Sequence, residues 1–538
     1  MREKRIKEKH IIIPVILFLC SVAILSCHKK ALTEKEIFYG DSLIISDFIF
    51  PTGINPLIVE HSISSNLRYL VFDSLLGKNG NNYEPRLART WKVSEDRKSL
   101  EFFLRKGIKF HDGVEFTSED VRFTYELFEK TISPNLDAEV DKNSLQNIVS
   151  IEILNPYLIR FVLKKPSKDF FETASIIGIL PSHIYKNVPI NNFDNSPLHF
   201  HPIGTGAFKL TKWSKEEIIL AANKEYFLGR PNLEKIIAKF YPNKEIAWAK
   251  IISGEADFFY LYPENYQFVA SNPNIKIYSF LDNYFYLLAL NNKNVILNKE
   301  IRKALNYSIN RDEIIKIALL GHGKISKGSI HPSSVFFDKT TEPYPYNPSL
   351  ALELLKKNGW EDRNGDHFLD KKGEKFSLSF CFFEADEPAE KIALIIQKQL
   401  LDLGIDMEIK PLDINKFYEI IFRKKQYDAA IVPFTIDVDR RLFHSNPVIA
   451  THNIFNYSNP KIDKFLEQIE NTEDVFAKKR LYKEFQMELK EDPPGVFLFW
   501  RETLVALDKR FAGVDIGPDG ILKNVRNWYV PKEKQKYK

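Results

Sequence analysis

Residues that could act as nucleophiles, general bases or metal ligands are present in this 538-residue chain, but not at the spacings that catalysis usually needs. The sequence contains no HExxH motif for zinc, no GxSxG motif for a serine nucleophile and no cysteine motif with a plausible nucleophile. We therefore expect a protein that is not an enzyme. A hydrolase whose catalytic set is assembled from distant residues stays open as an alternative.

Two groups of side chains have the composition of a cation site. The first is an alternating set of acidic and amide residues: Asp362, Asn364, Asp366 and Asp370. A calcium loop needs glycine at its sixth position and glutamate at its twelfth, where this chain has His367 and Gly373, so a polar turn explains the set better. The second group is His199 and His201, which would share one face of a strand, but no third ligand is apparent nearby. We predict neither a metal nor a cofactor.

The N-terminus predicts export. Five basic residues precede an apolar run from Ile11 to Leu25, which contains Pro14 and is shorter than the roughly 20 residues needed to span a bilayer. This is the layout of a signal peptide, here residues 1–26. Ile24-Leu25-Ser26-Cys27 resembles the lipobox of bacterial lipoproteins, which makes Cys27 the candidate lipidated residue.

A lipidated linker would then cover residues 27–36, and the protein would be anchored by lipid to the cell envelope, facing the periplasm or the outer surface. Which membrane carries the anchor stays open. The alternative is a signal peptide that happens to contain cysteines, as Cys20 shows. After Cys27 the chain keeps only Cys381, so lipidation of Cys27 would leave no pair for an internal disulfide.

Charge and composition exclude some partners. Residues 1–26 contain five basic and two acidic side chains, so removing them lowers the formal net charge from +5 to +2. Such a balance lacks the positive footprint of a nucleic-acid binder. With 44% hydrophobic residues, the remainder is long enough to bury two or three cores. Only the ends, His28 to Glu36 and Lys532 to Lys538, look disordered.

The elements that must position any site alternate between strands and helices. Leu100 to Leu104 alternates as a strand with residues 100, 102 and 104 on one face. Thr117 to Asp120 forms a capped helix start, followed by apolar residues at helical spacing: Val121, Tyr125 and Phe128. Further helices are predicted at these ranges: 312–320, 349–357, 388–403 and 475–489. Because each apolar stripe needs a sheet to cover, the class is α/β.

Several segments together resemble one family, the extracellular solute-binding proteins of peptide and nickel ABC importers, often called family 5. The most specific segments are Tyr83-Glu-Pro-Arg-Leu-Ala-Arg-Thr-Trp91 and Leu104-Arg-Lys-Gly-Ile-Lys-Phe-His-Asp-Gly113. They are followed in the expected order by Pro202-Ile-Gly-Thr-Gly-Ala-Phe208, Ile301-Arg-Lys-Ala-Leu-Asn-Tyr-Ser and the closing Trp528-Tyr529. The resemblance covers roughly residues 37 to 530.

The resemblance implies a two-lobed periplasmic-binding-protein-like fold of type II, in the large cluster that has an extra subdomain in lobe I. Lobe I would comprise residues 37–284, with the subdomain at roughly 75–200. Lobe II would comprise 285–495, and residues 496–538 would return to lobe I and form a basic tail. Two crossing strands between the lobes imply a hinge, and closure would bury a ligand at the interface.

Peptide-binding relatives use an aspartate of the second lobe, shortly after a tryptophan, to hold the ligand's ammonium group. In the equivalent stretch Asp437 takes the place of the aspartate and Phe434 that of the tryptophan, with Asp439 as the second choice. The alternative is a solvated loop carboxylate paired with Arg440 or Arg441. No residue is apparent that would hold a ligand carboxylate.

The resemblance therefore predicts the substrate-binding lipoprotein of an ABC importer, a monomer that captures a peptide-like solute and presents it to the permease subunits. Alternatives from the same fold are binding of another solute, such as a nickel chelate or an oligosaccharide, or a role as a surface sensor or adhesin. A secreted hydrolase is the least favoured alternative.

Overall fold

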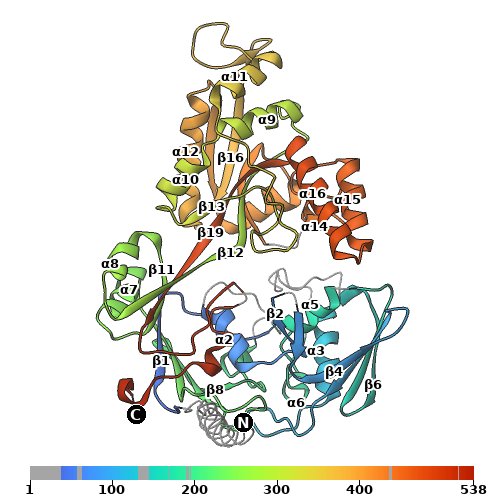
Figure 1. Ribbon diagram of the computed structural model, residues 1–538, viewed down its shortest axis with the longest axis vertical. Coiled ribbons are helices and arrows are strands. Elements are labelled where there is room, and N and C mark those ends of the chain that lie inside the picture. Colours follow the sequence, from blue (N-terminus) through green and yellow to red (C-terminus); the bar gives the residue numbers. More distant parts are fainter. Residues whose placement is uncertain are drawn as a thin grey trace, which may run out of the picture.

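The computed structural model describes most of the chain after residue 37, and this part forms two lobes joined by two long strands (Figure 1). The ranges described are 38–56, 63–80, 82–130, 145–167, 169–189, 193, 196–435, 439–518 and 520–537. The predicted signal peptide, Cys27 and the linker 27–36 lie outside them. In these ranges no helix combines the length and the apolar composition needed to span a bilayer.

One large mixed sheet runs through both lobes. Its strand order is β17-β16-β18-β12-β19-β11-β1-β10-β9-β8, and β13 pairs with β19 outside this path. In the lower lobe of Figure 1 the strands are β1 (Ser42–Asp47), β8 (Phe208–Trp213), β9 (Glu217–Ala222), β10 (Lys235–Phe240) and β11 (Phe258–Leu261). In the upper lobe they are β13 (Gly323–Ile325), β16 (Ser377–Phe383), β17 (Asp406–Leu412) and β18 (Ala429–Thr435).

Two strands pass from one lobe to the other, β12 (Ile275–Leu290) and β19 (Gly495–Asp508), and they pair antiparallel. The lower lobe also contains a hairpin and a separate four-stranded sheet. These strands are β2 (Leu76–Asn79), β3 (Asn82–Pro85), β4 (Ala88–Val93), β5 (Ser99–Leu104), β6 (Ile148–Asn155) and β7 (Leu158–Leu163). A short hairpin of β14 (Asp370–Lys371) and β15 (Glu374–Lys375) belongs to the upper lobe.

Helices cover the sheets in both lobes. The lower lobe has α2 (Ile63–Val71), α3 (Ser118–Lys130), α5 (Asp169–Ile176), α6 (Ser182–Tyr185), α7 (Lys244–Ile252) and α8 (Tyr266–Ala270). The upper lobe has α9 (Lys299–Ser308), α10 (Arg311–Ala318), α11 (Pro348–Lys357), α12 (Glu387–Leu401), α13 (Ile414–Phe417), α14 (Asp439–Phe443), α15 (Pro460–Asn471) and α16 (Val475–Glu491). The four helices predicted between residues 312 and 489 are confirmed to within two residues at each end.

Side-chain caps explain where many of these helices begin. The amide oxygens of Asn298, Asn310, Asn347 and Asn459 accept hydrogen bonds from backbone amides in the first turns of α9, α10, α11 and α15. The carboxylate of Asp474 does the same for α16. Such caps satisfy donors that a helix start leaves unpaired, typically stabilising it by about 1 kcal/mol.

The buried apolar residues form separate cores. One core joins β1, β5, β7, β9 and β10 of the lower lobe to chain-terminal residues that include Trp528. Two others lie on opposite faces of the upper lobe's sheet, and one of them includes Phe285, Phe434 and Trp500. The strand predicted at 100–104 is confirmed, because Leu100, Phe102 and Leu104 are buried while the residues between them are not.

The C-terminal tail differs from the prediction of disorder. Lys532–Lys534 form a 3-10 turn, and the Lys536 ammonium lies 2.7 Å from a carboxylate oxygen of Asp508. The backbone amide of Lys536 donates to the buried Asp41 carboxylate at 2.9 Å. Buried carboxylates need charged or hydrogen-bonding partners, and the basic tail supplies them, which composition alone did not indicate.

Candidate binding cleft

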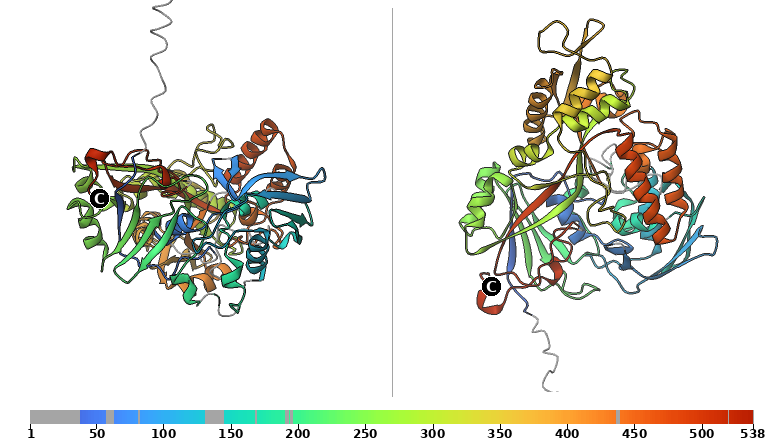
Figure 2. Two further views of the ribbon diagram at one scale, coloured as in Figure 1. Left: turned by 90° about the horizontal axis from the view of Figure 1, so that it is seen from below. Right: turned by 45° about the horizontal axis from the view of Figure 1, so that its top comes forward.

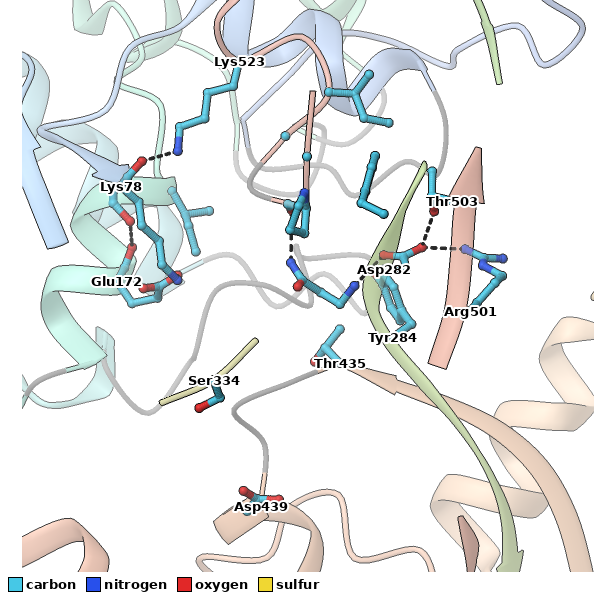
Figure 3. Close-up of a pocket in the computed structure, with 18 of the residues that line it drawn as sticks. Lys78, Glu172, Asp282, Tyr284, Ser334, Thr435, Asp439, Arg501, Thr503 and Lys523 are labelled. Carbon is cyan, nitrogen blue, oxygen red and sulfur yellow. Dashed lines mark hydrogen bonds and ion pairs between the residues drawn. The ribbon is translucent and has the colours of Figure 1, made fainter. Parts of the chain in front are cut away.

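A cleft of about 2810 Å³ lies between the lobes and is lined by residues of both (Figure 3). A pocket for a small molecule usually has roughly 300 to 1,000 Å³. This cleft therefore has room for a ligand larger than a typical small molecule. Its lining mixes aromatic, polar and charged side chains of both signs.

The two strands that cross between the lobes form one end of the cleft. Their pairing runs regularly as far as Leu281 with Glu502 and resumes at Phe285 with Trp500, so three residues of β12 lie opposite one residue of β19. Such bulges bend a strand and increase its local twist. The bulge therefore directs the residues between these pairs toward the cleft, where Asp282, Tyr284 and Arg501 line it.

Charged side chains at this crossing are held by one another. The carboxylate of Asp282 accepts hydrogen bonds from Arg501 Nη2 at 2.9 Å and from Thr503 Oγ1 at 3.0 Å (Figure 3). Tyr286 donates its hydroxyl to Asp386 Oδ1 at 3.2 Å. Burial raises the pKa of Asp386, although the nearby Arg501 acts in the opposite direction. The Arg501 guanidinium thus lies near two carboxylates, those of Asp282 and Asp386.

The lower lobe contributes a second set of paired charges. Lys78 Nζ lies 2.7 Å from Glu172 Oε1, and the Tyr83 hydroxyl donates to Glu172 Oε2 at 3.0 Å. Lys523 donates to the backbone carbonyl of Lys78 (Figure 3). Nearer to the hinge Asp47 also lines the cleft, and burial raises its pKa even though its carboxylate accepts bonds from two backbone amides.

Among the described residues, two ion pairs of a lysine or arginine connect the lobes directly. Lys244 at the start of α7 lies 2.7 Å from Glu387 of α12 and 3.1 Å from Glu264. Burial would lower the pKa of Lys244, but the hydrogen bonds to both carboxylates raise it. At the other side of the cleft, Arg97 in the turn between β4 and β5 donates from Nη2 to Glu473 Oε2 at 3.2 Å. These lobes therefore face each other across a cleft that is bridged at two edges.

The three ligand-binding residues predicted from sequence fall in three different situations. Asp437 lies outside the described residues, although Thr435 on one side of it and Asp439 on the other both line the cleft. Asp439 begins α14 and is 8% exposed (Figure 3). The ring of Phe434 packs in the core, 6.0 Å from that of Phe285, and is absent from the residues that line the cleft.

The neighbouring arginine of this segment has a partner of its own. Arg440 Nη1 lies 2.5 Å from Glu470 Oε2, an acceptor on α15. Among the described residues, Arg440 therefore pairs with Glu470, which is not one of the aspartates predicted to bind the ligand.

The two candidate cation groups have other roles in the structure. His199 lies in a 3-10 turn, Pro197–Phe200, and not on a strand, which corrects the premise of a two-histidine face. Its ring contacts Asn55 Nδ2 at 2.7 Å and the carbonyl of Phe193 at 2.5 Å. Asp362 accepts bonds from two backbone amides, as in a polar turn. No group of three or more potential metal ligands occurs within the described ranges.

Several cleft residues were missed by sequence reasoning. Asp282 and Arg501 come from strands more than 200 positions apart, and nothing local marks them. Arg86 also lines the cleft, and it lies inside the segment 83–91 that resembled the family. A charged residue in a motif with otherwise structural roles was the signal that could have identified it.

The fold and the cleft together define a two-lobed solute-binding protein, with a ligand site between lobes joined by crossing strands. A match to the bacterial extracellular solute-binding proteins, family 5 (middle region), spans residues 82–448, and the chain belongs to this family. It is 28% identical over 505 residues to the oligopeptide-binding protein AppA of Bacillus subtilis (strain 168), covering 92% of each chain.

Solved structures show the same relationship. The oligopeptide-binding protein AppA from Bacillus subtilis, in complex with a nonapeptide, is 27% identical and superimposes with a TM-score of 0.77, covering 92% of this chain and 100% of that one. NikZ from Campylobacter jejuni, in complex with Ni(L-His), is also 27% identical, with a TM-score of 0.75 and coverage of 91% and 99%. The α/β, two-lobed periplasmic-binding-protein-like fold is therefore confirmed.

Proposed function

We propose that this chain is the substrate-binding lipoprotein of an ABC importer, that it captures a peptide-like solute between its lobes and that it presents the closed complex to the permease. The observation that carries the proposal is the cleft of about 2810 Å³, which is bounded by two strands continuous through both lobes. The likeness to AppA, solved with a nonapeptide, supports a ligand of peptide size.

The charges of the cleft suit a zwitterionic, extended ligand. A peptide has to withdraw an ammonium group, a carboxylate and a polar backbone from water, which is unfavourable unless each finds a partner. The cleft offers carboxylates, among them Asp439 and Asp282, and guanidinium groups. In the proposal, Asp437 or Asp439 of the second lobe holds the ammonium group, and the lobes act as the units 37–284 and 285–495, with the chain returning to the first after 496.

Binding without turnover is the expected behaviour, so one experiment separates binding from catalysis. The mature protein is incubated with a mixture of tri-, penta- and nonapeptides, and its melting temperature is recorded. The peptides are then recovered, and their masses are measured by mass spectrometry. We expect a raised melting temperature and intact peptides, because a ligand that binds only the folded state stabilises it. Peptide fragments would favour the hydrolase alternative, and an unchanged melting temperature with every mixture would contradict the proposal.

A nickel chelate is the second candidate solute, favoured by the likeness to NikZ, which was solved with Ni(L-His). In such a complex the histidine supplies donor atoms, so the protein need not provide a full ligand set. The same melting experiment with nickel and histidine, compared with each alone, tests this candidate. Stabilisation by the chelate but not by peptides would replace the peptide proposal.

A further inference from the structure

Arg86 differs from other arginines of the cleft in where its partner carboxylate lies. Arg97, Arg440 and Arg501 each pair with a carboxylate that itself lines the cleft: Glu473, Glu470 and Asp282. Arg86 Nη1 instead donates to Oδ1 of Asp73 at 3.3 Å. Asp73 is fully buried and is not part of the cleft lining. The side chain of Arg86, which is 18% exposed, does line the cleft. Arg86 is therefore held by a carboxylate that lies outside the cleft.

The Asp73 carboxylate, which holds Arg86, accepts a further hydrogen bond on each of its two oxygens. The Tyr226 hydroxyl donates to Asp73 Oδ1 at 2.7 Å, and Thr205 Oγ1 donates to Oδ2 at 3.0 Å. The backbone is fixed as well, because Arg105 Nε donates to the carbonyl of Arg86 at 2.7 Å. A binding group held in one geometry loses little conformational entropy when a ligand arrives.

A planar guanidinium such as that of Arg86 has a shape that suits a carboxylate. Arginine has five N–H donors in a planar fork. Within the described residues, the side chain of Arg86 makes one hydrogen bond, to Asp73. Burial acts to lower the pKa of Arg86, but Asp73, Tyr226, Glu84 and Tyr69 together raise it, so the fork is charged at neutral pH. Partial burial strengthens a charged hydrogen bond relative to one in water.

We propose that Arg86 binds a carboxylate of the captured solute and thereby makes the protein prefer solutes with a free carboxylate over their amides. This inference rests on the proposed function, since it assigns one end of the ligand to the lower lobe. The carboxylate can be the C-terminus of a peptide or an acidic side chain, because the fork recognises the group and not its source.

Competitive capture tests this inference. A random pentapeptide mixture without Asp or Glu is synthesised half as C-terminal acids and half as C-terminal amides, and a limiting amount of protein is added. The captured acids and amides are then counted by mass spectrometry. We expect the native protein to enrich acids about 10- to 100-fold, as a charged hydrogen-bonding pair typically contributes. A second mixture of amides, with Glu or Gln at one position, shows whether a side-chain carboxylate serves equally.

The variants are chosen so that folding does not obscure the result. The double variant Asp73→Asn/Arg86→Gln leaves no unpaired buried charge, and we expect it to capture acids and amides about equally. Arg86→Lys keeps the charge without the fork and should enrich acids less than the native protein does. Arg89→Gln, on the exposed side of β4, makes the same charge change outside the cleft and should behave as native.

Two outcomes would overturn the inference alone: equal capture of acids and amides by the native protein, or native enrichment in the double variant. If the native protein captures no peptide from any mixture, the proposed peptide function and this inference both fail. The ratio is measured within one sample, so a loss of folded protein lowers both captured amounts without changing it.

Discussion

At the scale of single residues, the cleft's charges are largely paired before any ligand arrives. Asp282 has Arg501 and Thr503 as partners, and Glu172 has Lys78 and Tyr83. Pairing keeps the open cleft from carrying isolated half-buried charges, whose desolvation is unfavourable. We therefore expect the charged ends of a ligand to bind to side chains whose charges are already held in position, such as Arg86 and Asp439 at the start of α14.

Substitution of Asp437 tests which residue holds the ligand's ammonium group. If Asp437 holds the ligand's ammonium group, Asp437→Asn leaves a desolvated charge without its counterpart, which typically costs about 3–5 kcal/mol, or at least a 100-fold loss of affinity. Calorimetry with a peptide found by melting-temperature screening measures the change. Asp362→Asn, in an exposed turn of the upper lobe, is the matched control.

A distinct result separates the two candidate aspartates. Loss of affinity in Asp439→Asn with native binding in Asp437→Asn would move the ammonium site to the first turn of α14. Native affinity in both variants would remove this segment from charge recognition altogether.

Lipidation is the second residue-scale prediction. Cys27→Ser removes the thiol that would be acylated, so we expect no incorporation of labelled fatty acid and release of the protein from the membrane fraction. Cys20→Ser, inside the apolar run, leaves the proposed anchor intact and should be labelled as native. Equal labelling of the Cys27 variant would show that the anchor is elsewhere.

At the scale of elements, a turn with two glycines packs closely against the end of α2. The amide of Gly206 donates to the carbonyl of Val71 at 2.8 Å, at the end of α2. A Cβ atom at Gly204 would lie 2.0 Å from that carbonyl oxygen, which no side chain tolerates without moving the backbone. This close approach explains why the segment 202–208 contains two glycines.

We therefore expect Gly204→Ala to destabilise the protein by about 1–3 kcal/mol or more, seen as a lower melting temperature. Gly517→Ala is the matched control, since no heavy atom lies within 4 Å of the Cβ that it would add. An unchanged melting temperature for Gly204→Ala would mean that the turn and α2 separate readily.

The sequence predicts the helices and strands more accurately than it predicts the residues of the cleft. Helices with a capping residue and an apolar stripe, such as Val475–Glu491, were located closely because both signals are local. The pattern predicts a strand face at His199, but Pro197 begins a 3-10 turn there. The composition of the tail after Lys532 predicts disorder, because it does not reveal the partners of the tail, Asp41 and Asp508.

The cleft was harder to predict than the elements around it. The resemblance predicts Phe434 at the ligand, but its strand position pairs it with Phe285, and its ring packs in the core. Asp282 and Arg501 meet only because β12 and β19 cross with a bulge. Contacts of this kind depend on tertiary pairing, which no local pattern encodes.

At the scale of the whole molecule, the crossing strands and the rim contacts define how the lobes can move. β12 and β19 are continuous between the lobes, so we expect a bend at their bulge to change the lobe angle without breaking either core. The side chains of Arg97 and Glu473 are 53% and 58% exposed, and those of Lys244 and Glu387 are 29% and 46% exposed, so each ion pair between the lobes contributes about 0.2–1 kcal/mol. We therefore expect closure to be driven mainly by the ligand, through its contacts with both lobes.

Small-angle X-ray scattering of the mature protein, recorded with and without the peptide mixture, tests closure on a ligand most directly. We expect a smaller radius of gyration with bound peptide, and the same shift in an Arg97→Gln variant, because the ligand and not the rim pair supplies the driving force. Identical scattering curves from free protein and from protein shown by mass spectrometry to hold peptide would contradict closure on the ligand.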